Sequence, residues 1–106
     1  MRVVRPMPNL SLHPSARQEY IDAVDWYQQR SQASADRFVS EVEHVLAQLG
    51  VNPARYGWYD DLHREAVLRR YPYSVVYQVD PSGDVLVVAI AHASREPGYW
   101  QGRTSP

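Results

Sequence analysis

The chain has 106 residues, enough for one domain with a single hydrophobic core. Its hydrophobic fraction of 44% excludes a disordered polypeptide, and its net charge of -1 excludes a strongly basic nucleic-acid-binding protein. No cysteine is present, so disulfides, thiolate zinc sites and cysteine nucleophiles are also excluded.

All positive side chains are arginine, because the chain contains 11 Lys and Arg residues and none of them is lysine. Arginine suits bidentate recognition of phosphate or carboxylate, although a compositional bias of the source genome explains the pattern equally well. We expect neither a signal peptide in residues 1–12 nor a membrane-spanning segment, and therefore a cytoplasmic protein.

The first half of the chain predicts a helical hairpin. Residues 1–8 are punctuated by proline and predict an irregular lead, and residues 9–13 could form a short strand. Apolar residues at helical spacing then predict one helix over residues 14–30 and a second that follows the polar break at 31–34. Gly50 and the Asn52-Pro53 pair are expected to stop the second helix.

The second half predicts a small sheet. Residues 55–63 form an aromatic and acidic loop, and strands are expected over 65–70, 73–79 and 85–92, with a turn at 80–84. The continuously apolar run 85–90 predicts a strand buried on both faces, inside the sheet. Strict alternation would place Leu86, Val88, Ile90 and His92 on one face of that strand.

Two groups of residues could carry chemistry. His92 ends the last strand with Arg95 three residues on, so it is either an acid or base beside a phosphate-binding arginine or a structural hydrogen-bonding group. Arg64, Arg69 and Arg70 are either a solvated strand edge or a contact for phosphate or an acidic partner. The four histidines are scattered, so no metal site or other cofactor is expected.

Several segments, taken in order from Leu10 to Arg103, resemble the RelE/ParE superfamily of toxins from bacterial type II toxin-antitoxin modules, also called plasmid stabilisation proteins. The segments that carry the resemblance are Pro14-x-Ala16, Trp26-Tyr27, Arg37-Phe38, Asn52-Pro53, Leu68-Arg69-Arg70-Tyr71-Pro72-Tyr73, Val76-Tyr77 and Ala91-His92-x-x-Arg95-x-Pro97-Gly98-Tyr99-Trp100. The resemblance implies an α+β fold, a single domain over 1–106 in which a helical hairpin packs on a small, mostly antiparallel four-stranded sheet.

The resemblance also implies a growth inhibitor that a cognate antitoxin neutralises, with one of two targets. RelE-like members cleave ribosome-bound mRNA, whereas ParE-like members poison DNA gyrase; a third alternative is a binding module of this fold that is no longer toxic. Whether the chain is an enzyme stays open, since Ser74 stands where RelE-like nucleases carry an arginine. By analogy, His92, Arg95 and Tyr99 are the expected catalytic residues, and the expected RNA- or target-binding residues are Arg64, Arg69, Arg70 and Trp100.

Overall fold

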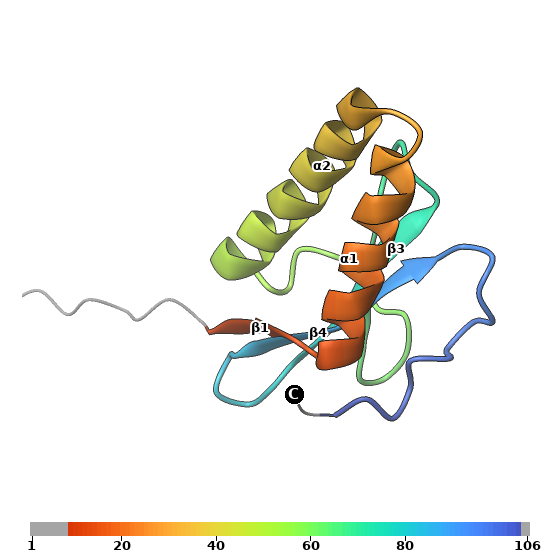
Figure 1. The fold of residues 1–106 in the computed structure, drawn as a ribbon. Coiled ribbons are helices and arrows are strands. Elements are labelled where there is room, and N and C mark those ends of the chain that lie inside the picture. The colour runs from red at the N-terminus through yellow and green to blue at the C-terminus, as the bar shows by residue number, and fades with distance from the viewer. Residues whose placement is uncertain (1–8, 105–106) are drawn as a thin grey trace, which may run out of the picture.

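A computed structural model describes residues 9–104 of the chain; the irregular lead predicted for residues 1–8 lies outside them. The elements follow in the order β1 (Leu10–Leu12), α1 (Pro14–Gln28), α2 (Gln32–Val51), β2 (Arg64–Val67), β3 (Tyr73–Val79) and β4 (Val85–His92). Both helices cover the same face of the sheet (Figure 1). The α+β fold with a helical hairpin is therefore confirmed.

The four strands form one sheet in the order β1-β4-β3-β2. β1 runs parallel to β4, whereas the pairs β2–β3 and β3–β4 are antiparallel, which confirms the expected mostly antiparallel sheet. β4 lies between two other strands, and most of its residues are buried, as its apolar sequence predicts.

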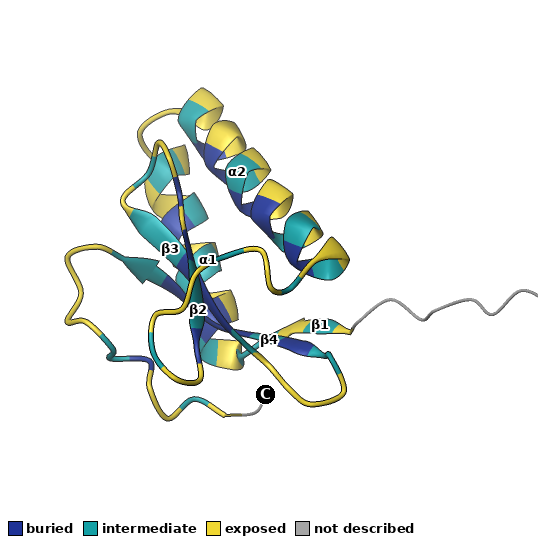
Figure 2. Cartoon of the chain, turned by 180° about the vertical axis from the view of Figure 1, so that it is seen from behind, coloured by how far each residue is buried: buried dark blue, intermediate teal, exposed yellow. Residues whose placement is uncertain are grey.

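The main core fills the space between the helices and the sheet, where the buried residues face one another (Figure 2). Phe38 on α2 is fully buried at its centre, with its ring 5.1 to 6.1 Å from four tyrosine rings. A smaller core on the opposite face of the sheet packs Trp100 against Val76, Val88 and Ala89. The chain after β4 therefore covers the face that the helices leave open.

The boundaries of α2 differ from those predicted. The helix begins at Gln32, inside the expected polar break, because the Ser31 hydroxyl accepts a hydrogen bond from the Ser34 amide and caps the first turn. It also continues through Gly50 and ends at Val51. The stop comes from Pro53, because a residue before proline avoids the helical region, and Asn52 is extended.

The end of β2 was also predicted wrongly, because the strand stops at Val67 and not at residue 70. Tyr71 turns inward after it, packs on Phe38 and donates a hydrogen bond of 2.8 Å to the Ser34 carbonyl. Arg69 and Arg70 consequently lie in the exposed connection between β2 and β3, outside the sheet.

A bulge in β4 changes which side chains share a face. Val76 pairs with Ala89 and Tyr77 pairs with Val87, so Val88 is an extra residue without a partner in β3. Leu86 and Val88 accordingly face the smaller core, whereas Ile90 and His92 face the helices. The prediction that all four share one face was wrong, because strict alternation does not hold across a bulge.

Tyr20 on α1 and Glu43 on α2 link the two helices through a hydrogen bond of 3.2 Å. Burial, together with the charge and hydrogen bond of Glu43, raises the pKa of Tyr20 from 10.0 to about 12. Because the folded state favours the neutral phenol, this contribution to stability is complete below pH 10 and is lost as the pH rises through about 12. We expect an NMR titration of the tyrosine ring carbons to give Tyr20 a pKa near 12.

Glu43→Gln removes the charge but keeps a hydrogen-bond acceptor, so it should lower the pKa of Tyr20 towards its ordinary value. Asp36→Asn is the matched control on the same helix, because Asp36 bonds only to Gln32 among the side chains of the described residues. An unchanged pKa of Tyr20 in the Glu43 variant would contradict the part of the shift that is assigned to the charge of Glu43.

Candidate functional site

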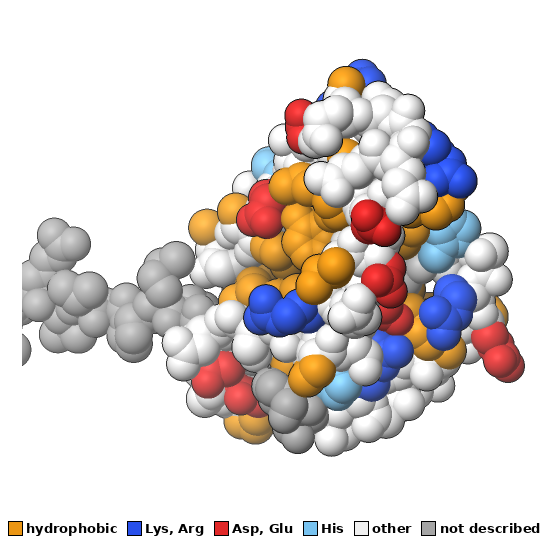
Figure 3. Space-filling view, viewed as in Figure 1, with side chains coloured by type: hydrophobic (Ala, Val, Ile, Leu, Met, Phe, Trp, Pro, Cys, Tyr) orange, Lys and Arg blue, Asp and Glu red, His pale blue; other side chains and the backbone are white. Residues whose placement is uncertain are grey.

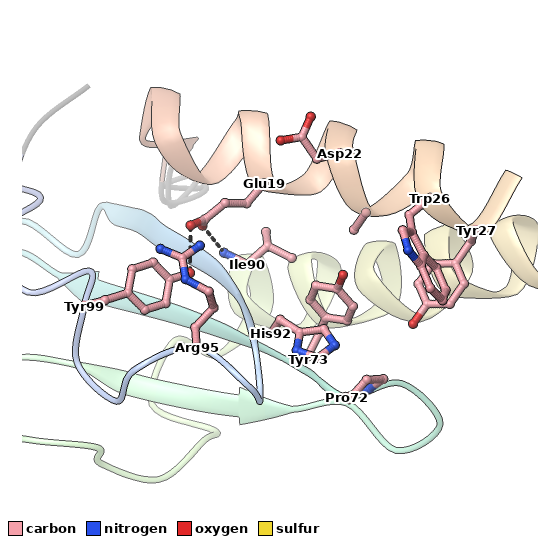
Figure 4. Close-up of a pocket in the computed structure, with 11 residues that line it drawn as sticks. Glu19, Asp22, Trp26, Tyr27, Pro72, Tyr73, Ile90, His92, Arg95 and Tyr99 are labelled. Atoms are coloured by element: carbon pink, nitrogen blue, oxygen red, sulfur yellow. Dashed lines mark hydrogen bonds between the residues drawn. The ribbon is translucent and has the colours of Figure 1, made fainter. Parts of the chain in front are cut away.

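The three residues expected to be catalytic lie in one pocket of about 390 Å³ between α1 and the end of β4. Glu19, Asp22 and Trp26 line it from α1, Tyr73 lines it from β3, and His92, Arg95 and Tyr99 come from β4 and the segment that follows (Figure 4). The bulge at Val88 is what turns His92 towards this pocket. The sequence thus predicts the cluster but not its position under α1.

His92 stands at the end of β4, and its environment fixes its neutral tautomer. The Ser94 amide donates a hydrogen bond of 3.0 Å to Nδ1, so in the neutral ring the proton is on Nε2. The ring also meets Tyr73 edge to face, with centroids 4.9 Å apart. His92 can therefore donate a hydrogen bond from Nε2, while its other nitrogen is already engaged.

Arg95 presents a free cation at the pocket. Its guanidinium carbon lies 3.9 Å from the centre of the Tyr99 ring, and its side chain has no hydrogen-bond or ion-pair partner within residues 9–104. A guanidinium stacked in this way keeps its planar set of donors available. Arg95 is therefore the side chain best placed to receive an anionic or carbonyl group from a bound molecule.

The Tyr99 hydroxyl is hydrogen-bonded to a carboxylate. It donates a hydrogen bond of 2.7 Å to Oε2 of Glu19 (Figure 4). Burial, followed by the hydrogen bond and charge of Glu19, raises the pKa of Tyr99 well above its ordinary range, although Arg95 and Arg103 act in the opposite direction. Tyr99 therefore holds its proton firmly and is a poor general base.

Glu19 is the main residue of the pocket that the sequence analysis missed. Besides Tyr99, it accepts a hydrogen bond of 3.0 Å from the Ile90 amide and forms an ion pair with Arg103. Its position on the polar face of α1 looks like that of any solvated glutamate in the sequence. Only the packing of α1 over the β4 bulge reveals its role.

The residues expected to bind a target do not meet in this pocket. Arg64 donates a hydrogen bond of 2.6 Å to the Tyr56 carbonyl and stacks on Trp58, so part of its guanidinium serves the fold. Arg69 and Arg70 are exposed in the connection between β2 and β3. None of these three arginines lines the pocket that holds Arg95.

Trp100, the fourth of these residues, is only 3% exposed, so its ring is not available to a target in this structure. It packs on His63, with ring centroids 4.5 Å apart. His63 is itself buried, with Nδ1 2.8 Å from Oδ1 of Asp60 and Nε2 2.9 Å from Nε2 of Gln78. Trp100 therefore anchors the C-terminal segment to the sheet.

Asp60 completes this anchor. Desolvation alone would raise the pKa of Asp60, but hydrogen bonds from Gln101, His63 and two backbone amides outweigh it and lower the pKa well below its ordinary range. The charged carboxylate therefore persists beside His63 and Gln101, and the loop, the sheet and the C-terminal segment are held together.

Within residues 9–104, no three His, Cys, Asp or Glu side chains are grouped so that they could hold a metal ion. In the same part of the chain, no helix combines the length and hydrophobicity that a transmembrane segment requires.

Comparison with known proteins identifies the family. The sequence model described as "ParE toxin of type II toxin-antitoxin system, parDE" matches residues 10–97, which is most of the chain. The chain belongs to the ParE toxin family. A similar solved structure is described as "Chromosomal ParDE TA system from P. aeruginosa". No protein with a curated function matches the chain.

The Pseudomonas structure shares the fold of this ParE-family chain. The TM-score is 0.69 at 16% sequence identity, and the match covers 83% of this chain and 98% of the other. The match to the family model over residues 10–97 confirms the predicted membership of the RelE/ParE superfamily. The 16% identity to the Pseudomonas structure is too low to carry over individual residues.

Proposed function

We propose that this ParE-family toxin arrests growth in the cytoplasm by binding DNA gyrase, and that a cognate antitoxin neutralises it. Membership of the ParE family supports this target over the ribosome, because gyrase poisoning is the activity expected of ParE-like members. A toxin of this kind needs a surface that binds its target, but it needs no hydrolytic groups of its own.

The observation that carries the proposal is that, among the described residues, no unengaged base lies beside His92 and Arg95 in the pocket. RNA cleavage by attack of a 2'-hydroxyl needs a base at that hydroxyl. Among the described residues that line the pocket, Tyr99 holds its proton, Nδ1 of His92 accepts from Ser94, and Glu19 is paired with Arg103. The remaining carboxylate, Asp22, accepts from Gln18 and stands at the outer rim of the pocket (Figure 4).

The helical hairpin supplies a surface suited to an antitoxin. Hydrophobic side chains gather between the helices, with acidic side chains beside them (Figure 3). A hollow of about 360 Å³ on α1 lies here, lined by Tyr20, Ile21 and Val24 together with Asp22 and Asp25. Ile21 is 53% exposed, and exposed apolar groups with a polar rim are typical of protein-binding surfaces. We expect the antitoxin to cover this surface with an apolar segment.

A supercoiling assay tests the proposed target. Purified chain added to gyrase and relaxed plasmid should inhibit supercoiling and cause cleaved DNA to accumulate, and prior addition of the antitoxin should prevent both effects. Arg55→Ala serves as an active control, because Arg55 is exposed and lies outside the pocket. Unimpaired supercoiling at doses that stop growth would exclude gyrase as the target.

A second candidate function is ribosome-dependent mRNA cleavage, and one observation favours it. His92 with its Nε2 proton, the free cation of Arg95 and Tyr99 do converge in one pocket. Translation in vitro with purified chain distinguishes the two functions. Cut mRNA on programmed ribosomes would support the ribosomal target, whereas intact mRNA would exclude it and leave gyrase as the proposed target. Normal growth on overexpression without antitoxin would indicate a binding module that has lost toxicity.

A further inference from the structure

The side chain of Arg103 contacts a carboxylate, a backbone carbonyl and an aromatic ring. Its Nη1 and Nη2 donate to the two carboxylate oxygens of Glu19 at 3.1 and 3.2 Å, so the guanidinium and the carboxylate face each other as a bidentate pair. Nη1 also donates to the Val88 carbonyl at 2.9 Å. The guanidinium carbon lies 5.2 Å from the centre of the Tyr99 ring. A carboxylate, a carbonyl and an aromatic face are the groups that recognise arginine and discriminate against lysine.

The β4 bulge supplies the backbone part of this arrangement. β1 pairs with β4 only as far as Val87, so beyond that residue this edge of β4 has no neighbouring strand within residues 9–104. The Val88 carbonyl and the Ile90 amide on this edge bond instead to Arg103 and Glu19. The site therefore combines a side chain of α1 with the edge of β4.

Arg103 is attached more loosely than the site itself. Trp100 is the last buried residue of the described chain, and residues 101–104 belong to no helix or strand. Beyond Trp100, the Gln101 side chain bonds to Asp60, the backbone amides of Gln101 and Arg103 bond to the carbonyls of Gly98 and Trp100, and the Arg103 side chain makes the contacts given above. Segments with so few contacts and no regular secondary structure open at small free-energy cost.

We propose that Glu19, the Val88 carbonyl and the Tyr99 ring form an arginine-binding site, which the chain's own Arg103 fills and which an arginine side chain of a partner protein takes over when Arg103 leaves. The ion pair is largely covered but still reachable from solvent, with side-chain exposures of 20% and 16%, so a partner's arginine enters only as Arg103 leaves. The site opens beside the 390 Å³ pocket, because Glu19 and Tyr99 belong to both. Residues that flank the partner's arginine would thus enter that pocket.

Exchange at this site would act on the candidate functional residues. Tyr99 bonds to the same carboxylate as Arg103 and carries the stacked Arg95 on its ring. A partner that reorganises Glu19 therefore also repositions Arg95. Occupation of the arginine site would therefore affect the position of Arg95 through Glu19 and Tyr99.

Chemical rescue tests the proposal on the isolated chain. Arg103→Ala should lower the Tm, because Glu19 and the Val88 carbonyl lose their partner. Nα-acetyl-L-arginine amide should then bind saturably, raise the Tm of the variant and shift the Ile90 amide signal in NMR. The citrulline analogue, which lacks the charge, should do neither, and the lysine analogue should bind at least about tenfold more weakly.

Two comparisons keep the test decisive. In the unmodified chain, the arginine probe must compete with Arg103, so the same Ile90 shift should require at least about tenfold more probe; this measurement needs no variant. Glu19→Gln combined with Arg103→Ala should abolish the rescue. Equal effects of the arginine and citrulline probes, or rescue that survives loss of Glu19, would overturn the proposal. Neither gyrase nor antitoxin is present, so this outcome is separate from that of the supercoiling assay.

Discussion

Phe38→Ala is expected to cost about 3–5 kcal/mol of the free energy of unfolding. Phe38 is fully buried, and its ring contacts the rings of Tyr20, Tyr27, Tyr71 and Tyr73. Truncation removes this ring from a place where α1, α2 and β3 meet. Since small domains are stable by only about 5–15 kcal/mol, urea unfolding should show most of the stability gone or no folded state at all.

Ile21→Ala is the matched control for this measurement. Ile21 is also a large apolar residue of the hairpin, but it is 53% exposed, so its truncation should change stability by less than about 0.5 kcal/mol. Similar losses in the two variants would mean that the aromatic cluster is not the centre of the core.

Arg95→Ala is expected to abolish toxicity while leaving the Tm almost unchanged. The side chain is exposed, and its stacking on Tyr99 contributes about 0.5–1 kcal/mol at most. Its guanidinium is at the same time the cation that faces the pocket without a partner among the described residues. Colony counts after induction without antitoxin, together with thermal unfolding of the purified variant, measure both effects.

Arg55→Ala provides the comparison, because Arg55 is another exposed arginine near an aromatic ring, 5.8 Å from the centre of Tyr56. It lies outside the pocket, so the variant should stay fully toxic. If the Arg95 variant stays toxic, Arg95 is not part of the binding surface. If the variant does not fold, Arg95 has a structural role.

Most of the fold could be predicted from local patterns. The apolar stripes of the two helices and the continuous apolar run of β4 report burial directly, because each depends on the periodicity of one element. The grouping of His92, Arg95 and Tyr99 followed from their closeness in the sequence. Val75 and Tyr77 both lie on the face of β3 that packs on the helices, as alternation along a strand requires.

The remainder depends on contacts between distant residues. No local pattern marks Val88 as a bulge, and a single extra residue reverses the orientation of everything after it in β4. Glu19 meets Tyr99 and Arg103 only after the C-terminal segment has folded back past the edge of β4. The burial of Trp100 likewise depends on His63, which lies in a loop without a periodic pattern.

The parallel pairing of β1 with β4 has a consequence for synthesis and folding. In this pairing Leu10 lies beside Val85, which is far from it in the sequence. β1 therefore cannot join the sheet until β4 has been synthesised. The helices leave the ribosome before β2, β3 and β4, and their contacts are more local. During that interval the aromatic face around Phe38 has no sheet to pack on, and it is then that the nascent toxin is most exposed to aggregation and proteolysis.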